Sequence, residues 1–257
     1  MIKFFRNIRK KLAAENKSII RNTNYFKYAI GEIFLVVVGI LIALQVNNWN
    51  HAFQARKAER ELIKNLVVDL QSDVKQLTEI IETNERRLMN MDSLLQYAGT
   101  DINSLESQSL LYLYARRSIM NYFPFNNQNR TMEKLSNNEI EIGKREVRDS
   151  IAYFQQHLIA LNGQTDSYRN AIFAARPTMF KLFKYYQFTD SIYVADRKWS
   201  GKEFSRLNED IDLQDEFFNY LASARGITRN YISEYWLKGH LRRTENLITL
   251  LKNEYQL

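Results

Sequence analysis

The longest apolar run of the chain lies near its N-terminus. Residues 28–46, YAIGEIFLVVVGILIALQV, include a single charged side chain, Glu32. As a helix, this run of 19 residues is about 28 Å long, which matches the roughly 30 Å of hydrocarbon in a bilayer. The pattern therefore predicts a transmembrane helix over residues 28–49.

A cleaved secretory signal peptide is the alternative for this run. After Glu32 the uninterrupted apolar stretch is only twelve residues long, as in a signal peptide. However, 27 residues precede Tyr28, and the run ends in LQVNN without a small-x-small cleavage site. We therefore expect an uncleaved signal anchor.

The apolar periodicity continues beyond the predicted membrane segment. No glycine or proline occurs between Gly39 and Gly99, so a long juxtamembrane helix is predicted over residues 50–98. Its apolar positions step by three or four, as a heptad seam with one stutter does. The seam faces either a second copy or the chain's own later helices, and we favour the latter. Its members are Ile63, Leu66, Leu70, Val74, Leu77, Ile81, Asn84, Leu88, Met91 and Leu95.

Further helical patterns fill residues 99–257. They cover residues 103–121, 144–175, 178–188 and 211–224, and a last helix follows Gly226, with Gly239 as a local weakness. With only eight glycines and two prolines in 257 residues, turn-rich β folds are excluded. The predicted fold is all-α: an N-terminal transmembrane helix that continues into a long helix, which packs in an antiparallel periplasmic helical bundle.

The net charge of +7 is concentrated before residue 50. Residues 1–49 hold eight basic and two acidic side chains, a net +6, and the remaining 208 residues are almost neutral. A nucleic-acid partner is therefore not expected. By the positive-inside rule, residues 1–27 lie in the cytoplasm and the C-terminal domain in the periplasm, with the helix in the inner membrane.

The leader, residues 1–27, has an amphipathic start. Its apolar residues fall on one side of a helical wheel, which is typical of a helix that lies on a membrane surface. An anionic inner leaflet attracts its cations. The alternative is that these charges only determine the orientation of the membrane helix. The cations are Lys3, Arg6, Arg9, Lys10 and Lys11.

These residues resemble an uncharacterised family of single-pass inner-membrane proteins known mainly from Bacteroidota. The resemblance rests on MIKFFRNIRKKL at 1–12, ENK at 15–17 and YFKYAIGEIFLVVVGILIALQVNNWN at 25–50. Residues 123–135, FPFNNQNRTMEKL, look like the family's loop-plus-helix signature, but a Ser-Gly pair that usually follows is Asn137, Asn138 and Glu139 here. The resemblance implies an inner-membrane anchor with a periplasmic helical domain, and no activity.

The predicted membrane helix carries one candidate interface. Glu32, Val36, Gly39 and Ala43 fall on one helix face, and Gly39 with Ala43 permits close approach of another helix. Glu32 is then paired or protonated in a helix interface, carries protons, or instead snorkels to the cytoplasmic surface. We favour packing against another membrane helix. An interfacial belt of aromatic and polar side chains is expected from Tyr25, Tyr28, Gln45, Asn47, Asn48 and Trp49.

Motifs of catalysis and metal binding do not occur in the sequence. His51, His157 and His240 are far apart, lack a second ligand at i+3 or i+4, and are expected at the surface or at helix caps. No phosphate loop, nucleophile elbow or dinucleotide fingerprint is present. We therefore expect no enzymatic activity, no cofactor and no metal.

An aromatic stretch follows the second proline. Its residues, with two lysines between, can stack on sugars, but their spacing is more typical of core packing against later aromatics such as Phe217 and Tyr231. The stretch comprises Phe180, Phe183, Tyr185, Tyr186, Phe188, Tyr193 and Trp199.

The sequence thus predicts a membrane-anchored periplasmic scaffold or regulatory protein of the cell envelope. Its expected partners are the lipid bilayer and either a second copy or another membrane protein. The alternative is a subunit of a multi-component membrane complex, of stator-like or transport type, with Glu32 in the intramembrane helix interface.

Overall fold

The computed structural model describes residues 21–99, 105–127, 129–137, 141–184 and 207–257. These residues form α-helices, one π-helix and connecting segments, and no strand occurs among them. The all-α prediction is therefore confirmed. The elements are α2 (Arg21–Leu95), α3 (Leu105–Ala115), η1 (Arg116–Met120), α4 (Arg130–Ser136), α5 (Arg145–Ala174), α6 (Arg176–Leu182), α8 (Ile211–Tyr231) and α9 (Leu237–Tyr255).

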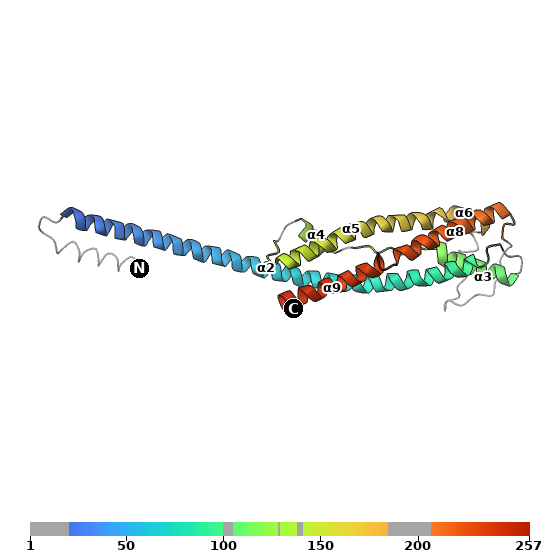
Figure 1. Ribbon diagram of the computed structural model, residues 1–257, viewed down its shortest axis with the longest axis horizontal. Coiled ribbons are helices and arrows are strands. Elements are labelled where there is room, and N and C mark those ends of the chain that lie inside the picture. The colour runs from blue at the N-terminus through green and yellow to red at the C-terminus, as the bar shows by residue number, and fades with distance from the viewer. Residues whose placement is uncertain (1–20, 100–104, 128, 138–140, 185–206) are drawn as a thin grey trace. The chain divides into compact units, whose positions relative to one another are not determined.

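The chain divides into two compact units, Met1–Lys57 and Ala58–Leu257. The described part of the first unit is the N-terminal portion of α2, coloured blue in Figure 1. From Tyr28 onward its apolar side chains are largely exposed, including Ile33, Phe34 and Leu41. The exposed apolar surface is what a helix in contact with lipid requires, because the hydrocarbon replaces a protein core.

In the second unit, α5 runs parallel to the buried part of α2. Glu59 pairs with Gly143 and Asn84 pairs with Tyr168, a constant offset of 84 residues. The segment between η1 and α5, which includes α4, returns the chain to the beginning of this unit. By contrast, Glu59 bonds Tyr255 while Glu85 bonds Lys238, so the pairing runs backwards along α9. The α8–α9 pair is therefore antiparallel to α2 and α5 (Figure 1).

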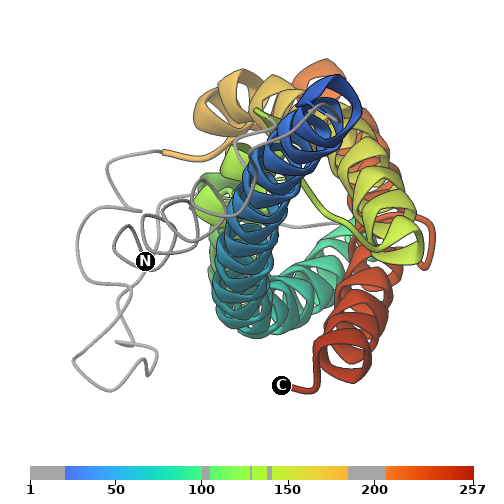
Figure 2. The same ribbon diagram turned by 90° about the vertical axis from the view of Figure 1, so that its left-hand side faces the viewer.

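Two apolar cores fill the second unit. One lies between the start of the buried part of α2, α4, the first half of α5 and the end of α9, and includes Leu66, Val147 and Leu251. The other lies between the end of α2, α3, η1, the second half of α5, α6 and α8, and includes Tyr112 and Phe217. Figure 2 looks along this arrangement, with α5 in yellow and α9 in red.

The heptad seam of α2 packs against the chain's own later helices, as favoured above. Seven of its ten members are buried, and Val74, Leu88 and Leu95 are partly buried against the same cores. Between them, Leu62, Val67 and Leu94 are also buried, which widens the seam to the broad stripe of a helix in a globular core.

Two guanidinium groups donate hydrogen bonds to carbonyl groups at the end of η1. Arg176 donates to the carbonyls of Ile119 and Met120, and Arg87 donates to the carbonyl of Asn121. A helix leaves its last carbonyls unpaired and carries partial negative charge at that end. The two arginines satisfy both requirements and so fix the end of η1 between α2 and α6.

The helix boundaries around Gly226 differ from the sequence prediction. Helix α8 does not stop near Ala224 but continues through Gly226 to Tyr231, because Ala224, Thr228 and Tyr231 extend its buried face. The packing of that face outweighs the roughly 1 kcal/mol that a helical glycine costs. Pro177 lies in the first turn of α6, where its missing N–H group is tolerated, and α5 ends just before it.

Candidate functional site

The predicted membrane segment lies within α2. Of the described residues, only this helix is both long and apolar enough to cross a membrane, and its most apolar stretch has no buried residue. Tyr28 and Trp49, at the two ends of residues 28–49, are both exposed. This part of α2 thus has the length and composition of a membrane span.

The candidate interface residues lie along this part of α2. Glu32, Val36, Gly39 and Ala43 are all exposed, and steps of four, three and four residues place them on one helix face. A Cβ atom added at Gly39 would meet nothing within 4 Å, so the glycine is not required by the fold of this chain. Among the described residues, none covers this face.

The other predicted membrane contacts are placed only in part. Gln45, Asn47 and Asn48 are exposed beside Trp49, and Tyr25 belongs to α2. The basic leader, with Lys3, Arg6, Arg9, Lys10 and Lys11, lies outside the described residues, so its amphipathic helix stays a prediction.

The segment that includes Asn129 and α4 docks on α2 through two aspartates. Asp69 accepts from the hydroxyl of Thr131 at 2.7 Å and from its backbone N–H at 3.3 Å. Asp73 accepts from the amide of Asn129 at 3.3 Å, and Asn129 in turn caps α4 by accepting from the N–H of Met132. Burial raises the pKa of Asp73, against the lowering effect of the Asn129 hydrogen bond. Asn129 and Thr131 thus hold the N-terminal end of α4 against two acidic side chains of α2.

A second polar cluster joins the beginning of the buried α2 to the end of α9. The carboxylate of Glu59 accepts from the N–H of Gly143 at 3.0 Å and from the phenol of Tyr255. Burial, and then the bond to Glu59, raise the pKa of Tyr255. Lys144 adds an ion pair of 2.9 Å to Glu254 and lies 4.9 Å from the centre of the Tyr255 ring. These five residues thus connect α2, the segment before α5 and the end of α9.

A third polar cluster interrupts the α2 seam. The phenol of Tyr168 donates to Asn84 at 2.6 Å, and the Asn84 amide donates to the carbonyls of Ile80 and Phe123. Arg87, which is 2% exposed, donates to the Tyr168 oxygen. Burial lowers the pKa of Arg87 and raises that of Tyr168 to about 12. Every partner named here is neutral, so the cluster holds a buried cation by hydrogen bonds rather than by a carboxylate.

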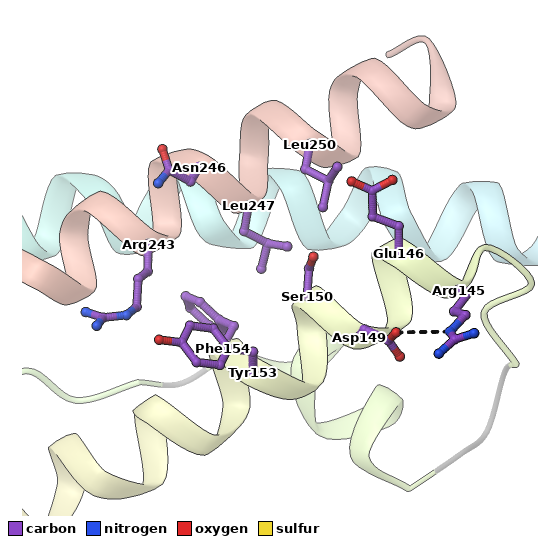
Figure 3. Close-up of a pocket in the computed structure, with 10 residues that line it drawn as sticks. All are labelled: Arg145, Glu146, Asp149, Ser150, Tyr153, Phe154, Arg243, Asn246, Leu247 and Leu250. Carbon is purple, nitrogen blue, oxygen red and sulfur yellow. Dashed lines mark ion pairs between the residues drawn. The ribbon is translucent and has the colours of Figure 1, made fainter.

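A groove of about 790 Å³ runs between α5 and α9. Its apolar floor includes Phe154, Leu247 and Leu250, and the two leucines point from α9 toward α5 in Figure 3. Arg243 lines the same groove, and one nitrogen of its guanidinium is buried without a hydrogen-bond partner. At the rim, Arg145 pairs with Asp149 at 3.4 Å. The groove can take an apolar group, with exposed charges of both signs at its edge.

The expectation that every histidine lies at the surface or at a cap is wrong for His240. His51 is exposed, but His240 is completely buried, and its Nδ1 lies 3.2 Å from Nδ1 of His157. The two residues are 83 positions apart and lie on different helices. No local spacing links the two histidines, so this contact has no signal in the sequence.

The aromatic stretch after Pro177 is placed in part. Phe183 is buried, with ring centroids 5.1 Å from Tyr112 and 5.5 Å from Phe217, as core packing predicts. Phe180 is partly exposed, and the remaining members from Tyr185 to Trp199 lie outside the described residues. Within the residues described, no group of three or more His, Cys, Asp or Glu is arranged to hold a metal ion.

Comparison with known proteins gives one family. Residues 32–156 match a family described as "Family of unknown function (DUF6090)". The match begins at Glu32, continues through α2, α3 and α4, and ends in α5 one residue before His157. It therefore includes the Asp69 and Asp73 anchor and Asn84, but not α8 or α9. No curated protein and no solved structure matches the chain significantly.

Proposed function

We propose that the chain is a membrane-anchored helical scaffold or regulatory protein of the cell envelope, without catalysis. The observation that carries this proposal is the continuity of α2 from Arg21 to Leu95. One helix contains both an exposed apolar segment of membrane-spanning length and the buried seam of a helical unit. The chain therefore passes from the apolar segment to the helical unit without a loop, which supports an anchored scaffold.

In this proposal the protein is a single-pass protein of the inner membrane. The excess of basic residues before Tyr28 supports a cytoplasmic N-terminus by the positive-inside rule, with residues 50–257 in the periplasm. The leader binds the anionic inner leaflet. The face formed by Glu32, Val36, Gly39 and Ala43 receives a second copy or another membrane protein.

The topology can be tested with single cysteines, because the sequence contains none. We would introduce Ser18→Cys or Ala52→Cys and label intact spheroplasts with a membrane-impermeant maleimide. Ala52→Cys should react at once, and Ser18→Cys only after the membrane is permeabilised. The reverse pattern, or a mature protein that lacks residues 1–27 by mass spectrometry, would refute the anchor.

Purification in mild detergent tests the scaffold function. Glu32→Gln and a matched change outside the apolar segment, Glu79→Gln, provide the comparison. A soluble envelope protein that is retained by both variants supports the scaffold. Recovery of the chain free of envelope proteins counts against it.

A subunit of a multi-component membrane complex is the second candidate. The exposed carboxyl group of Glu32 in the apolar segment favours this candidate. An ionisable group in a lipid-facing helix is energetically costly, and such groups usually pair with another protein group. A multi-span partner at constant stoichiometry that is lost in Glu32→Gln but kept in Glu79→Gln would favour this candidate over the scaffold.

A further inference from the structure

The contact between His157 and His240 is a hydrogen bond in the plane of both rings. The ring planes differ by 10° and the centroids lie 5.3 Å apart, while the two Nδ1 atoms are 3.2 Å apart. Face-to-face stacked rings would have centroids much closer than this for parallel planes in contact. The separation instead fits rings placed edge to edge, with the two Nδ1 atoms between their centres.

The neighbours of the pair determine which nitrogen carries each proton. Nε2 of His157 lies 3.2 Å from the carbonyl oxygen of Tyr235, which can only accept, so His157 is protonated on Nε2. In the neutral ring its Nδ1 is then an acceptor, and Nδ1 of His240 must donate to it. Nε2 of His240 is left as an unprotonated, buried nitrogen without a hydrogen-bond partner.

This arrangement has no place for an additional proton. A proton on Nδ1 of His157 would force His240 into its other tautomer, with a buried Nε2–H that has no acceptor. A proton on each ring would set two N–H groups against each other at 3.2 Å. Burial lowers the pKa of both histidines, and that of His240 to about 3.

The charged groups around the pair do not compensate for a proton. Arg243, on the next turn of α9, lowers the pKa of both rings. Two nearby carboxylates are already paired: Glu234 with Arg242 at 3.2 Å, and Glu85 of α2 with Lys238 of α9 at 2.8 Å. On the remaining sides His240 packs against the rings of Phe154 and Phe125.

We propose that His157 and His240 form an acid-opened latch between α5 and the first turn of α9. Protonation of both rings breaks the Nδ1–Nδ1 bond and releases that turn together with the connection between α8 and α9, residues 232–236. Because Phe154 contacts His240 and also lines the groove of Figure 3, release of the turn alters the wall of the groove.

In the open state of the latch each histidine titrates near its ordinary pKa of about 6.5, and this value determines how strongly pH changes the open population. Each ring that is protonated only when the latch is open increases the open population by almost tenfold per pH unit below that value. Between pH 7 and pH 5, protonation of one histidine therefore increases the open population about 25-fold. Protonation of the second histidine increases the open population further.

Hydrogen exchange of the full chain in lipid nanodiscs tests the latch. The peptide that covers residues 232–241 should lose protection by at least about tenfold between pH 7 and pH 5, after correction for intrinsic exchange. The double variant His157→Asn/His240→Asn keeps a side-chain acceptor and donor at the Nδ1 positions but does not titrate. It should show no such loss, while His51→Asn, at an exposed histidine, should behave as the wild type.

Two results would overturn the latch. One is a wild-type peptide whose corrected protection does not change between pH 7 and pH 5. The other is a double variant that loses protection as the wild type does. If the double variant does not fold, ¹⁵N spectra of the wild type decide: the latch requires Nε2–H on His157 and Nδ1–H on His240 at pH 7, and any other pair of tautomers contradicts it.

Discussion

The phenol of Tyr168 on α5 donates a hydrogen bond of 2.6 Å to the side-chain oxygen of Asn84 on α2. Asn84 is completely buried and occupies a seam position, where every other member is apolar. A polar group in such a seam permits only the register that supplies its partners. The bond therefore fixes how far α5 is shifted along α2, in agreement with the same offset between Glu59 and Gly143.

Replacement of Asn84 by leucine should destabilise the helical unit by about 1–3 kcal/mol, although leucine is more apolar. It leaves the carbonyl of Phe123 without its Asn84 donor and removes the acceptor of Tyr168. The midpoint of thermal unfolding in detergent should fall by several degrees. The control is Asn90→Leu, whose amide bonds only the Arg86 carbonyl on its own helix. Equal stability of Asn84→Leu and wild type would contradict the register function.

Two glycines in helices should respond in opposite ways to alanine. A Cβ at Gly226, in α8, would meet nothing within 4 Å, whereas a Cβ at Gly239 would lie 2.0 Å from the carbonyl oxygen of Glu234. Gly226→Ala should stabilise the unit by about 0.5–1 kcal/mol, because alanine is the better helix former. Gly239→Ala must displace the backbone at the start of α9 and should destabilise it.

Thermal unfolding of the two alanine variants under one set of conditions measures this contrast. The opposite signs are the test, because a general effect of alanine would move both variants in the same direction. Unchanged stability of Gly239→Ala would contradict the close approach of the Glu234 carbonyl to Gly239.

The stability of the helical unit should depend on pH through His240. Its pKa of about 3 in the folded chain lies below the usual 6.5, so the folded state binds fewer protons than the unfolded state between these values. Its contribution is complete above about pH 6.5 and declines as the pH falls toward 3. From pH 7.5 to 5.5 the wild type should lose about 1.4 kcal/mol more than His240→Asn.

Denaturant unfolding at several pH values measures that difference, and carboxylates titrate mostly below this window. Parallel curves for wild type and His240→Asn would show that His240 does not lose its proton affinity on folding. This measurement concerns global unfolding and is separate from the local exchange that tests the latch.

Docking of α4 on α2 should depend on Asn129. Its side chain accepts from the N–H of Met132 and donates to Asp73, so alanine removes the cap and leaves a buried carboxyl group without that donor. We expect Asn129→Ala to cost about 1–2 kcal/mol and to increase proteolysis between α4 and α5. Asn230→Ala, at an exposed position of α8, is the control. Unchanged proteolysis would contradict the anchor.

The long helix and the fold class were predictable because their causes are local. Residues 40–98 contain no helix breaker, and the spacing from Ile63 to Leu95 identified the buried side of α2. The spacing also placed Asn84 in the seam. It could not name Tyr168 as the partner, because that contact joins residues 84 positions apart.

Long-range contacts also account for what the sequence did not predict. The sequence pattern predicts too early an end for α8, because Gly226 is a local signal, whereas burial of Thr228 and Tyr231 is a property of the packed unit. His157 and His240 carry no motif and meet only after α5 and α9 pack. Asp69 and Asp73 of α2 likewise form hydrogen bonds to Thr131 and Asn129, which lie more than 50 residues later, so their function in docking α4 is not visible in the local sequence.

Leu70 and Val68 test directly which side of α2 the later helices cover. Leu70 is fully buried, whereas Val68, two residues before it, is 63% exposed. Leu70→Ala should cost about 2–5 kcal/mol, because the removed methyl groups leave a cavity between α2 and its neighbours. Val68→Ala should change stability by less than about 0.5 kcal/mol. If a second copy instead covered the Val68 side, the thermal midpoint of the wild type would fall on dilution, and Val68→Ala would lower it at a concentration where the wild type is associated, since a shared interface depends on concentration. A low, concentration-independent cost at Val68 together with a large cost at Leu70 means that the seam stabilises the chain within one copy.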